Sequence, residues 1–220
     1  MFPRKKDEIK AIIFDVGGVL ALGKNNLSST QKFARTKGVH EYVAKKLKIS
    51  LDQWFDSIDS NYSGAIEGKI SGEKAIEIIS SGVKISKENL KKIIKKAYRN
   101  HFKQNKQLFE LVFNLKRMGY KIAVLSDQWM VSREAIMPEK LYNGFDEVII
   151  SYEVGFRKPN PKIYKLILKR LKLSARNCVF IDDQSWNLKP AKKLGMKTIL
   201  FKNNKQLFNH PNWKRLWGLK

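Results

Sequence analysis

The first regular pattern in the chain is a short apolar run over Ala11–Phe14, with charged residues before it and glycines after it. An uninterrupted apolar run that contains two isoleucines is typical of a buried strand. The run ends at Asp15, and Gly17 and Gly18 follow. A carboxylate at the carboxyl end of a parallel strand lies where open α/β folds bind ligands, and glycines there let backbone N–H groups approach an anion. A polar residue that merely closes a strand–helix loop would give the same pattern, so this stretch alone leaves both interpretations open.

From Lys106 onwards, helical and strand patterns alternate. Apolar residues at helical spacing predict the helices, and short apolar runs that stop at polar residues predict the strands. The predicted helices cover 107–118, 131–140, 161–171 and 188–194, and the predicted strands cover 120–125, 145–151, 178–181 and 197–201. Such alternation implies a parallel sheet with helices on both faces. We therefore expect a doubly wound, Rossmann-like α/β core.

The block between the first strand and this core has helical patterns only. Helices are expected over 27–37, 39–48, 51–60, 72–81 and 88–102. Ser50 and Gln53 have the spacing of a capping box, and Ser71 and Ser86 are expected N-caps. The domains follow from this pattern: a helical subdomain over 23–106, inserted into an α/β core made of 1–22 and 107–220.

Composition narrows the class of protein. With 220 residues, 43% of them hydrophobic and 11% aromatic, the chain can bury a sizeable core and is unlike a disordered chain. The formal net charge of +24 predicts attraction to phosphate groups or anionic surfaces. The basic residues are spread over the whole chain, so we expect at most weak, non-specific nucleic-acid binding.

Cysteine use and hydropathy bear on the compartment. Cys178 is the only cysteine, so a disulfide within the chain is impossible and a reducing compartment is expected. No apolar run approaches the roughly 18 residues needed to cross a bilayer, and the N-terminal residues lack an apolar signal segment. We expect a cytoplasmic protein with no membrane partner, and the oligomeric state stays open.

Polar residues stand at the ends of three predicted strands, and a parallel sheet would bring them to one edge. They are Asp15, Ser126 with Asp127, and Asp182 with Asp183. Crowded carboxylates repel one another unless a cation lies between them, and a hard ion such as Mg²⁺ suits their oxygen ligands. Ser126 and Lys158, which lies in a predicted loop, could hold an anionic group beside the metal. This set of groups suits phosphoryl transfer.

Four motifs carry a resemblance to a known family. Asp15 lies in FDVGGVL, Ser126 in LSD, Lys158 in GFRKPNPKIY, and three further polar residues (Asp182, Asp183 and Asn187) lie in FIDDQSWNLKPAKKLGMKTIL. In order and spacing these stretches resemble the motifs of the haloacid dehalogenase-like hydrolase superfamily, and the helical block lies where that family has its cap. The last motif is similar to that of the N-terminal phosphatase domain of soluble epoxide hydrolase and of related sugar-phosphate phosphatases.

The resemblance implies Mg²⁺-dependent hydrolysis of a small phosphate monoester, with a phosphorylated metabolite as substrate. Asp15 would be the nucleophile and would form an aspartyl-phosphate. Ser126 would hydrogen-bond the phosphoryl group, Lys158 would neutralise its charge, and Asp127 would complete the substrate-binding residues. The implied metal ligands are Asp15, the backbone carbonyl of Gly17, and Asp183, with Asp182 and Asn187 in supporting positions.

The chain departs from the family pattern at two positions. Phosphatases of the family usually carry an acid/base aspartate two residues after the nucleophile, where this chain has Gly17, and glycine cannot protonate a leaving alkoxide. Asp127 stands where asparagine commonly follows the serine or threonine, and it adds negative charge near the phosphate.

Two other functions stay open. A catalytically weak member could keep the phosphate site to bind a phosphate-bearing partner, for example RNA. Metal-free 2-haloacid dehalogenation is the other, although the pair Asp182 and Asp183 is easier to explain beside a cation. The three histidines lie far apart without metal-ligand spacing, so we expect them at surface or helix-face positions: His40, His101 and His210.

Overall fold

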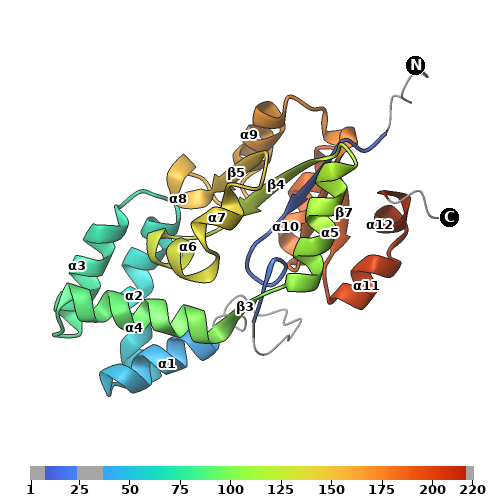
Figure 1. The fold of residues 1–220 in the computed structure, drawn as a ribbon. Coiled ribbons are helices and arrows are strands. Elements are labelled where there is room, and N and C mark those ends of the chain that lie inside the picture. The colour runs from blue at the N-terminus through green and yellow to red at the C-terminus, as the bar shows by residue number, and fades with distance from the viewer. Residues whose placement is uncertain (1–7, 24–36, 217–220) are drawn as a thin grey trace.

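A computed structural model describes residues 8–23 and 37–216 of the chain, and its centre is a five-stranded parallel sheet (Figure 1). The strands are β1 (Ala11–Phe14), β4 (Lys121–Ser126), β5 (Glu147–Ile150), β6 (Cys178–Asp182) and β7 (Lys197–Leu200). Their order across the sheet is β5-β4-β1-β6-β7. The chain therefore builds the sheet outwards from β1, first on one side and then on the other. Ligands of open α/β folds bind at such a reversal point.

Helices cover both faces of the sheet. The sheet separates two apolar cores, and neighbouring residues of β1 enter different ones: Ile12 belongs to one core and Ile13 to the other. The first core is closed by α5 (Lys106–Arg117), α11 (Asn204–Asn209) and α12 (Pro211–Leu216), and the second by α9 (Pro161–Leu171) and α10 (Ser185–Lys193). This arrangement confirms the doubly wound α/β fold expected from the sequence.

Four further helices form a separate layer beyond the carboxyl edge of the sheet, at the left of Figure 1. They are α1 (Lys37–Leu47), α2 (Leu51–Ile66), α3 (Gly72–Gly82) and α4 (Lys87–His101). Two short antiparallel strands, β2 (Ala21–Gly23) and β3 (Phe102–Gln104), pair where the chain leaves and re-enters the core. We call α1–α4 the cap helices; the exact division of the chain at 23–106 stays a prediction.

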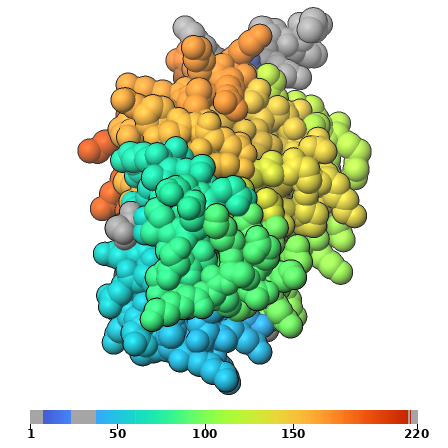
Figure 2. All heavy atoms as spheres, turned by 90° about the vertical axis from the view of Figure 1, so that its left-hand side faces the viewer, coloured from blue at the N-terminus to red at the C-terminus, as the bar shows by residue number. Residues whose placement is uncertain are grey.

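The cap helices are packed against the core. Viewed from their side in Figure 2, their atoms meet those of the segments that follow β4 and β5. Arg157 Nε lies 2.9 Å from a carboxylate oxygen of Glu67, and Lys95 of α4 pairs with Glu134. Gly68 has a φ of +66° and lies close to the Tyr152 carbonyl. A Cβ added at Gly68 would be 2.1 Å from the Tyr152 carbonyl oxygen. A glycine is therefore required at this contact between cap and core.

Several predicted helix starts are confirmed. Ser50 Oγ accepts a hydrogen bond from the Gln53 backbone N–H, and Gln53 Oε1 accepts one from the Ser50 backbone N–H, which completes the capping box. Ser71 and Ser86 cap α3 and α4 in the same way through the N–H three residues later. The helix expected over 27–37 falls almost entirely outside the described residues.

Other predicted boundaries are wrong. The helix expected over 88–102 ends at His101, because Phe102 takes an extended backbone and pairs with Gly23, so a strand does interrupt the 23–106 block. The helix expected over 131–140 is two helices, α6 (Met130–Ile136) and α7 (Glu139–Tyr142). Pro138 lies between them and lacks the N–H that a continuous helix needs.

One predicted strand is too long, and two histidines are buried. The strand expected over 145–151 stops at Ile150, and Ser151 begins the short helix α8 (Ser151–Val154). His40 and His101 lie at helix-face positions, as expected, on buried faces of α1 and α4. Within the described residues, no helix is both long and apolar enough to span a bilayer.

Candidate active site

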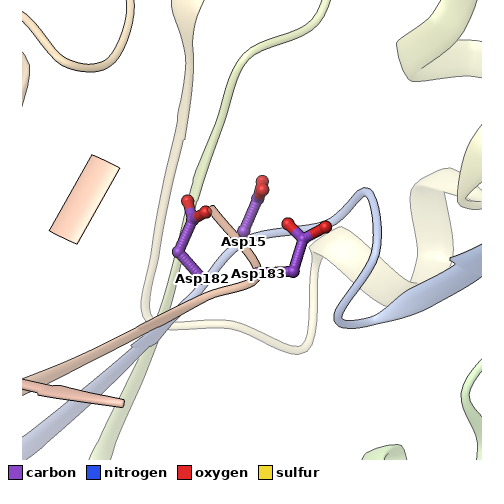
Figure 3. Close-up of side chains that lie close together, drawn as sticks. All are labelled: Asp15, Asp182 and Asp183. Atoms are coloured by element: carbon purple, nitrogen blue, oxygen red, sulfur yellow. The ribbon is translucent and has the colours of Figure 1, made fainter. Parts of the chain in front are cut away.

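The carboxyl ends of β1, β4 and β6 lie side by side, as the parallel register dictates. Phe14, the last residue of β1, pairs with Val124 of β4 and with Ile181 of β6. Asp15, which follows it, therefore lies level with Asp182. Figure 3 shows Asp15, Asp182 and Asp183 standing next to one another at the ends of the two strands. Within the described residues, these three are a group whose carboxylate oxygens lie within 4.8 Å of one another.

A buried ammonium lies among these carboxylates. Lys158 Nζ is 3.1 Å from Asp15 Oδ1 and 2.7 Å from Asp182 Oδ2, and only 4% of Lys158 is exposed. Burial alone would lower the pKa of Lys158, but the attraction of Asp15, Asp182 and Asp127 outweighs it and raises this pKa above its usual value. Lys158 therefore stays charged at neutral pH, and it neutralises part of the negative charge at the sheet edge.

Asp15 accepts hydrogen bonds from its own loop and from β4. Its Oδ1 accepts from the Val16 backbone N–H at 2.7 Å and from the Ser126 hydroxyl at 2.9 Å. The loop after it turns tightly, with the Gly18 N–H bonded to the Ala21 carbonyl at 2.8 Å and a φ of 86° at Gly18. Asp15 and Ser126 are thus brought together from positions 111 residues apart.

Asp182 is completely buried and surrounded by donors. Its Oδ1 accepts from the Gln184 backbone N–H at 2.7 Å, and the Asn187 amide lies 3.2 Å and 3.1 Å from its two oxygens. With Lys158 on Oδ2, both oxygens have partners. Asp182 and Asn187 therefore hold the loop after β6 in place, which fits the supporting positions expected for them.

Asp183 is more accessible than Asp182. It is half-buried, and its Oδ2 accepts a hydrogen bond from Gln184 Nε2 at 3.0 Å. Asp15 and Asp183 offer oxygen ligands of the kind that Mg²⁺ prefers, and one carboxylate oxygen of each lies within 4.8 Å of the other. The residues present therefore fit a bound divalent cation.

Asp127 has a contact that the sequence did not predict. Its Oδ1 accepts a hydrogen bond of 3.0 Å from the backbone N–H of Lys158. Burial raises the pKa of Asp127 to about 6, although the Lys158 charge acts in the opposite direction. The extra carboxylate is thus used to hold the loop that carries Lys158, and a contact with substrate stays a prediction.

Sequence reasoning missed two glutamines. Gln184 contacts both carboxylates of the last motif, and Gln128 Nε2 donates to Ser126 Oγ at 3.2 Å. A glutamine in a loop carries no signal of its own, because its partners are fixed only when the strands come together.

Comparisons with known proteins identify a family for this chain. A family model described as haloacid dehalogenase-like hydrolase matches residues 9–195. Bifunctional epoxide hydrolase 2 of Sus scrofa is 30% identical over 217 residues, which are 89% of this chain and 37% of that protein. Glyceraldehyde 3-phosphate phosphatase of Methanocaldococcus jannaschii is 29% identical over 203 residues, 87% of this chain and 84% of that protein. The chain thus spans only 37% and 32% of the two epoxide hydrolases, from Sus scrofa and Mus musculus.

Solved structures show the same fold. A HAD family enzyme from Bacteroides thetaiotaomicron superposes with a TM-score of 0.74 at 21% identity and covers 96% of this chain and 98% of its own. The same enzyme in complex with magnesium and inorganic phosphate gives 0.69 at 21% identity, with 87% and 93% covered. L-2-haloacid dehalogenase from Xanthobacter autotrophicus gives 0.55 at 19% identity, with 86% and 76% covered.

The buried ion pairs lead to a prediction about stability. Lys158→Met would leave the carboxylates of Asp15 and Asp182 without their ammonium partner, and removing one member of a buried pair typically costs about 3–5 kcal/mol. We expect the free energy of unfolding in urea, at pH 7 without added metal, to fall by that amount. Lys162→Met, at an exposed residue nearby, is the control and should change it by less than about 0.5 kcal/mol. Equal effects of the two variants would contradict the structural role given to Lys158.

Proposed function

The chain belongs to the haloacid dehalogenase-like hydrolase family, and from this premise we propose that it is a Mg²⁺-dependent phosphatase of small phosphate monoesters. One observation carries the proposal. The Asp15 carboxylate lies between a hydroxyl, Ser126 Oγ at 2.9 Å, and a buried ammonium, Lys158 Nζ at 3.1 Å, with Asp183 close by. A nucleophilic carboxylate with fixed positive charge and a hydrogen-bond donor beside it suits attack on phosphorus.

The metal would be held by Asp15, the backbone carbonyl of Gly17, and Asp183. When bound, Mg²⁺ supplies positive charge that offsets the repulsion between an anionic nucleophile and an anionic phosphate. Asp182 would act indirectly, because its oxygens are already engaged by Lys158, Asn187 and the Gln184 N–H. It keeps Lys158 and the loop after β6 in register with Asp15.

The reaction would proceed in two steps on Asp15. A carboxylate oxygen of Asp15 attacks phosphorus, the bond to the ester oxygen breaks, and an aspartyl-phosphate forms while the leaving group departs as an anion that takes a proton from water. A water molecule then attacks the phosphorus, the bond between phosphorus and the Asp15 oxygen breaks, and inorganic phosphate leaves with the Asp15 carboxylate restored and one proton released to solvent. In both steps Lys158 neutralises charge on the phosphoryl oxygens, and Ser126 turns its hydrogen bond from Asp15 to one of them.

The relatives support a phosphorylated metabolite as substrate. The Methanocaldococcus jannaschii relative is named for hydrolysis of glyceraldehyde 3-phosphate, and the Bacteroides thetaiotaomicron enzyme binds magnesium and inorganic phosphate. We propose the same class of substrate here, in the cytoplasm, without a membrane partner and with weak, non-specific affinity for nucleic acid at most. The packing of the cap helices against the segments after β4 and β5 supports a role for them in selecting the group that bears the phosphate.

Two alternatives have different requirements. Gly17 favours a phosphate-binding protein without turnover, because glycine cannot protonate the departing alkoxide as the usual aspartate would. Metal-free dehalogenation is disfavoured by Asp183, because it places a second carboxylate within 4.8 Å of Asp15, in an arrangement that suits a divalent cation. The three functions differ in their response to magnesium and in their products.

A panel of phosphate esters and 2-haloacids, each with Mg²⁺ and with a chelator, tests the proposal directly. We expect phosphate release with Mg²⁺ and its loss on chelation, because Mg²⁺ then no longer offsets the repulsion between the Asp15 carboxylate and the anionic phosphate. Asp183→Asn should raise the Mg²⁺ concentration needed for half-maximal activity at least about tenfold, which is the size of effect typical when a group at a metal site is lost. Glu153→Gln, at an exposed residue outside the site, is the matched control. Activity that survives chelation would refute the metal assignment, and halide release would favour the dehalogenase.

The missing acid leads to a second prediction. General acid catalysis is typically worth ~10²–10⁴-fold, and its absence should matter most for poor alkoxide leaving groups. Aryl and acyl phosphates, whose leaving groups are stabilised anions, should therefore react much faster than sugar phosphates. Gly17→Asp should narrow this gap. The left-handed backbone of this loop lies at Gly18, with φ 86°, so an aspartate at Gly17 does not have to adopt it.

Steady-state rates on aryl or acyl phosphates and on sugar phosphates test this predicted preference. Equal rates in the unmodified protein would show that another group, with Asp127 as the first candidate, supplies the proton. No turnover of either class with Mg²⁺ bound would favour the phosphate-binding alternative.

A further inference from the structure

A chain of buried hydrogen bonds leads away from Ser126 towards α7. Gln128 Nε2 lies 3.2 Å from Ser126 Oγ, and the Tyr142 hydroxyl lies 3.2 Å from Gln128 Oε1. Ser126, Gln128 and Tyr142 are all buried, at 1%, 3% and 2% exposure. None of the four motifs explains a glutamine at 128 or a tyrosine at 142, and the chain leads directly to the candidate nucleophile.

Charge fixes the direction of every bond in this chain. Asp15 as a carboxylate can only accept, so the single hydroxyl hydrogen of Ser126 is donated to Asp15 Oδ1 at 2.9 Å. Ser126 Oγ can then only accept from Gln128, which must present its NH₂ group. Gln128 Oε1 consequently accepts from Tyr142, whose burial raises its pKa and keeps the hydroxyl protonated.

The backbone of Gln128 is fixed as well. Its N–H donates to Ser151 Oγ at 3.1 Å, and Ser151 Oγ donates to the Gln128 carbonyl at 3.1 Å. Ser151 is the first residue of α8 and is completely buried. The loop after β4 is thus held to the end of β5, and the side chain of Gln128 has little freedom to turn away from Ser126.

We propose that Gln128 and Tyr142 are positioning residues that commit the Ser126 hydroxyl to act as a donor. A serine hydroxyl can otherwise rotate between donating and accepting positions, which adds an entropic cost each time it must donate to an incoming phosphoryl oxygen. Donation from Gln128 occupies one lone pair of Ser126 Oγ and polarises its O–H bond. This inference rests on the proposed function, because Ser126 is assumed to contact the phosphoryl group.

A double-mutant cycle tests the coupling. Gln128→Met has similar length and no donor, and it should lower kcat/KM for an aryl phosphate by about tenfold, the value of one hydrogen bond in a buried network. Tyr142→Phe should lower it by about threefold, since it acts one bond further away. In a Ser126→Ala background, neither substitution should have a further effect greater than about twofold.

Two more variants separate donation from packing. Gln128→Glu keeps the shape but offers an acceptor to Ser126 at neutral pH, so it should lower kcat/KM at least as much as Gln128→Met. Tyr120→Phe removes a partly buried tyrosine hydrogen bond, 2.9 Å to the Leu216 carbonyl, at the opposite end of β4, and should leave kcat/KM unchanged. Full activity of Gln128→Glu, or additive effects in the Ser126→Ala background, would overturn the inference.

A binding measurement keeps this test separate from the proposed function. If the unmodified protein hydrolyses no ester, the proposed function fails, and the same cycle is run on the affinity for inorganic phosphate with Mg²⁺, by calorimetry. Weaker binding by Gln128→Met that disappears in the Ser126→Ala background would still support the positioning role. Additive effects, or no phosphate binding by any variant, would overturn it.

Discussion

The ion pairs of Lys158 with Asp15 and Asp182 are the interaction on which the rest of the site depends. Carboxylates from two adjacent strands cannot be buried at one sheet edge without a cation, since the desolvation of each charge costs several kcal/mol. Lys158 provides that cation at 3.1 Å and 2.7 Å. The loop that carries it is held from both sides, by Asp127 on its backbone N–H and by Glu67 of the cap on the preceding Arg157. The cap helices and the acidic edge of the sheet are therefore linked through one short segment.

The topology explains why this edge can hold such a group of charges. β1 lies in the middle of the sheet, and the chain leaves it at Asp15 before the sheet is extended in both directions. Strands on either side then deliver Ser126 and Asp182 to the same place. The site is assembled from segments far apart in sequence, and apolar cores on both faces keep their positions fixed. Rigid placement of this kind is what a preorganised charged site requires.

Much of this could be predicted from the sequence, because the relevant physics is local or follows from the direction of the strands. Each apolar run that stops at a carboxylate or hydroxyl marks a strand end, and parallel strands end at one edge, which placed Asp15, Ser126 and Asp182 together. The helix N-caps at Ser50, Ser71 and Ser86 could be predicted for the same reason, because each depends only on residues close in the sequence. Two contacts could not be predicted, because they depend on how the loops pack: the Asp127 side chain with the Lys158 backbone N–H, and the Gln128 side chain with the Ser126 hydroxyl. The pairing of Phe102 with Gly23 could not be predicted either, because a strand of three residues is too short to show an alternation of apolar and polar residues.

Replacement of the proposed nucleophile tests the central claim most directly. Asp15→Asn removes one negative charge from a crowded edge and keeps the shape of the side chain, so the fold should be retained while attack on phosphorus is lost. The measurement is phosphate release from an aryl phosphate in the presence of Mg²⁺, with the urea unfolding transition of the same variant recorded alongside. The account predicts no detectable turnover and a cooperative unfolding transition, because Lys158 keeps its ion pair with Asp182 at 2.7 Å. Turnover at the unmodified rate by a folded Asp15→Asn protein would contradict it.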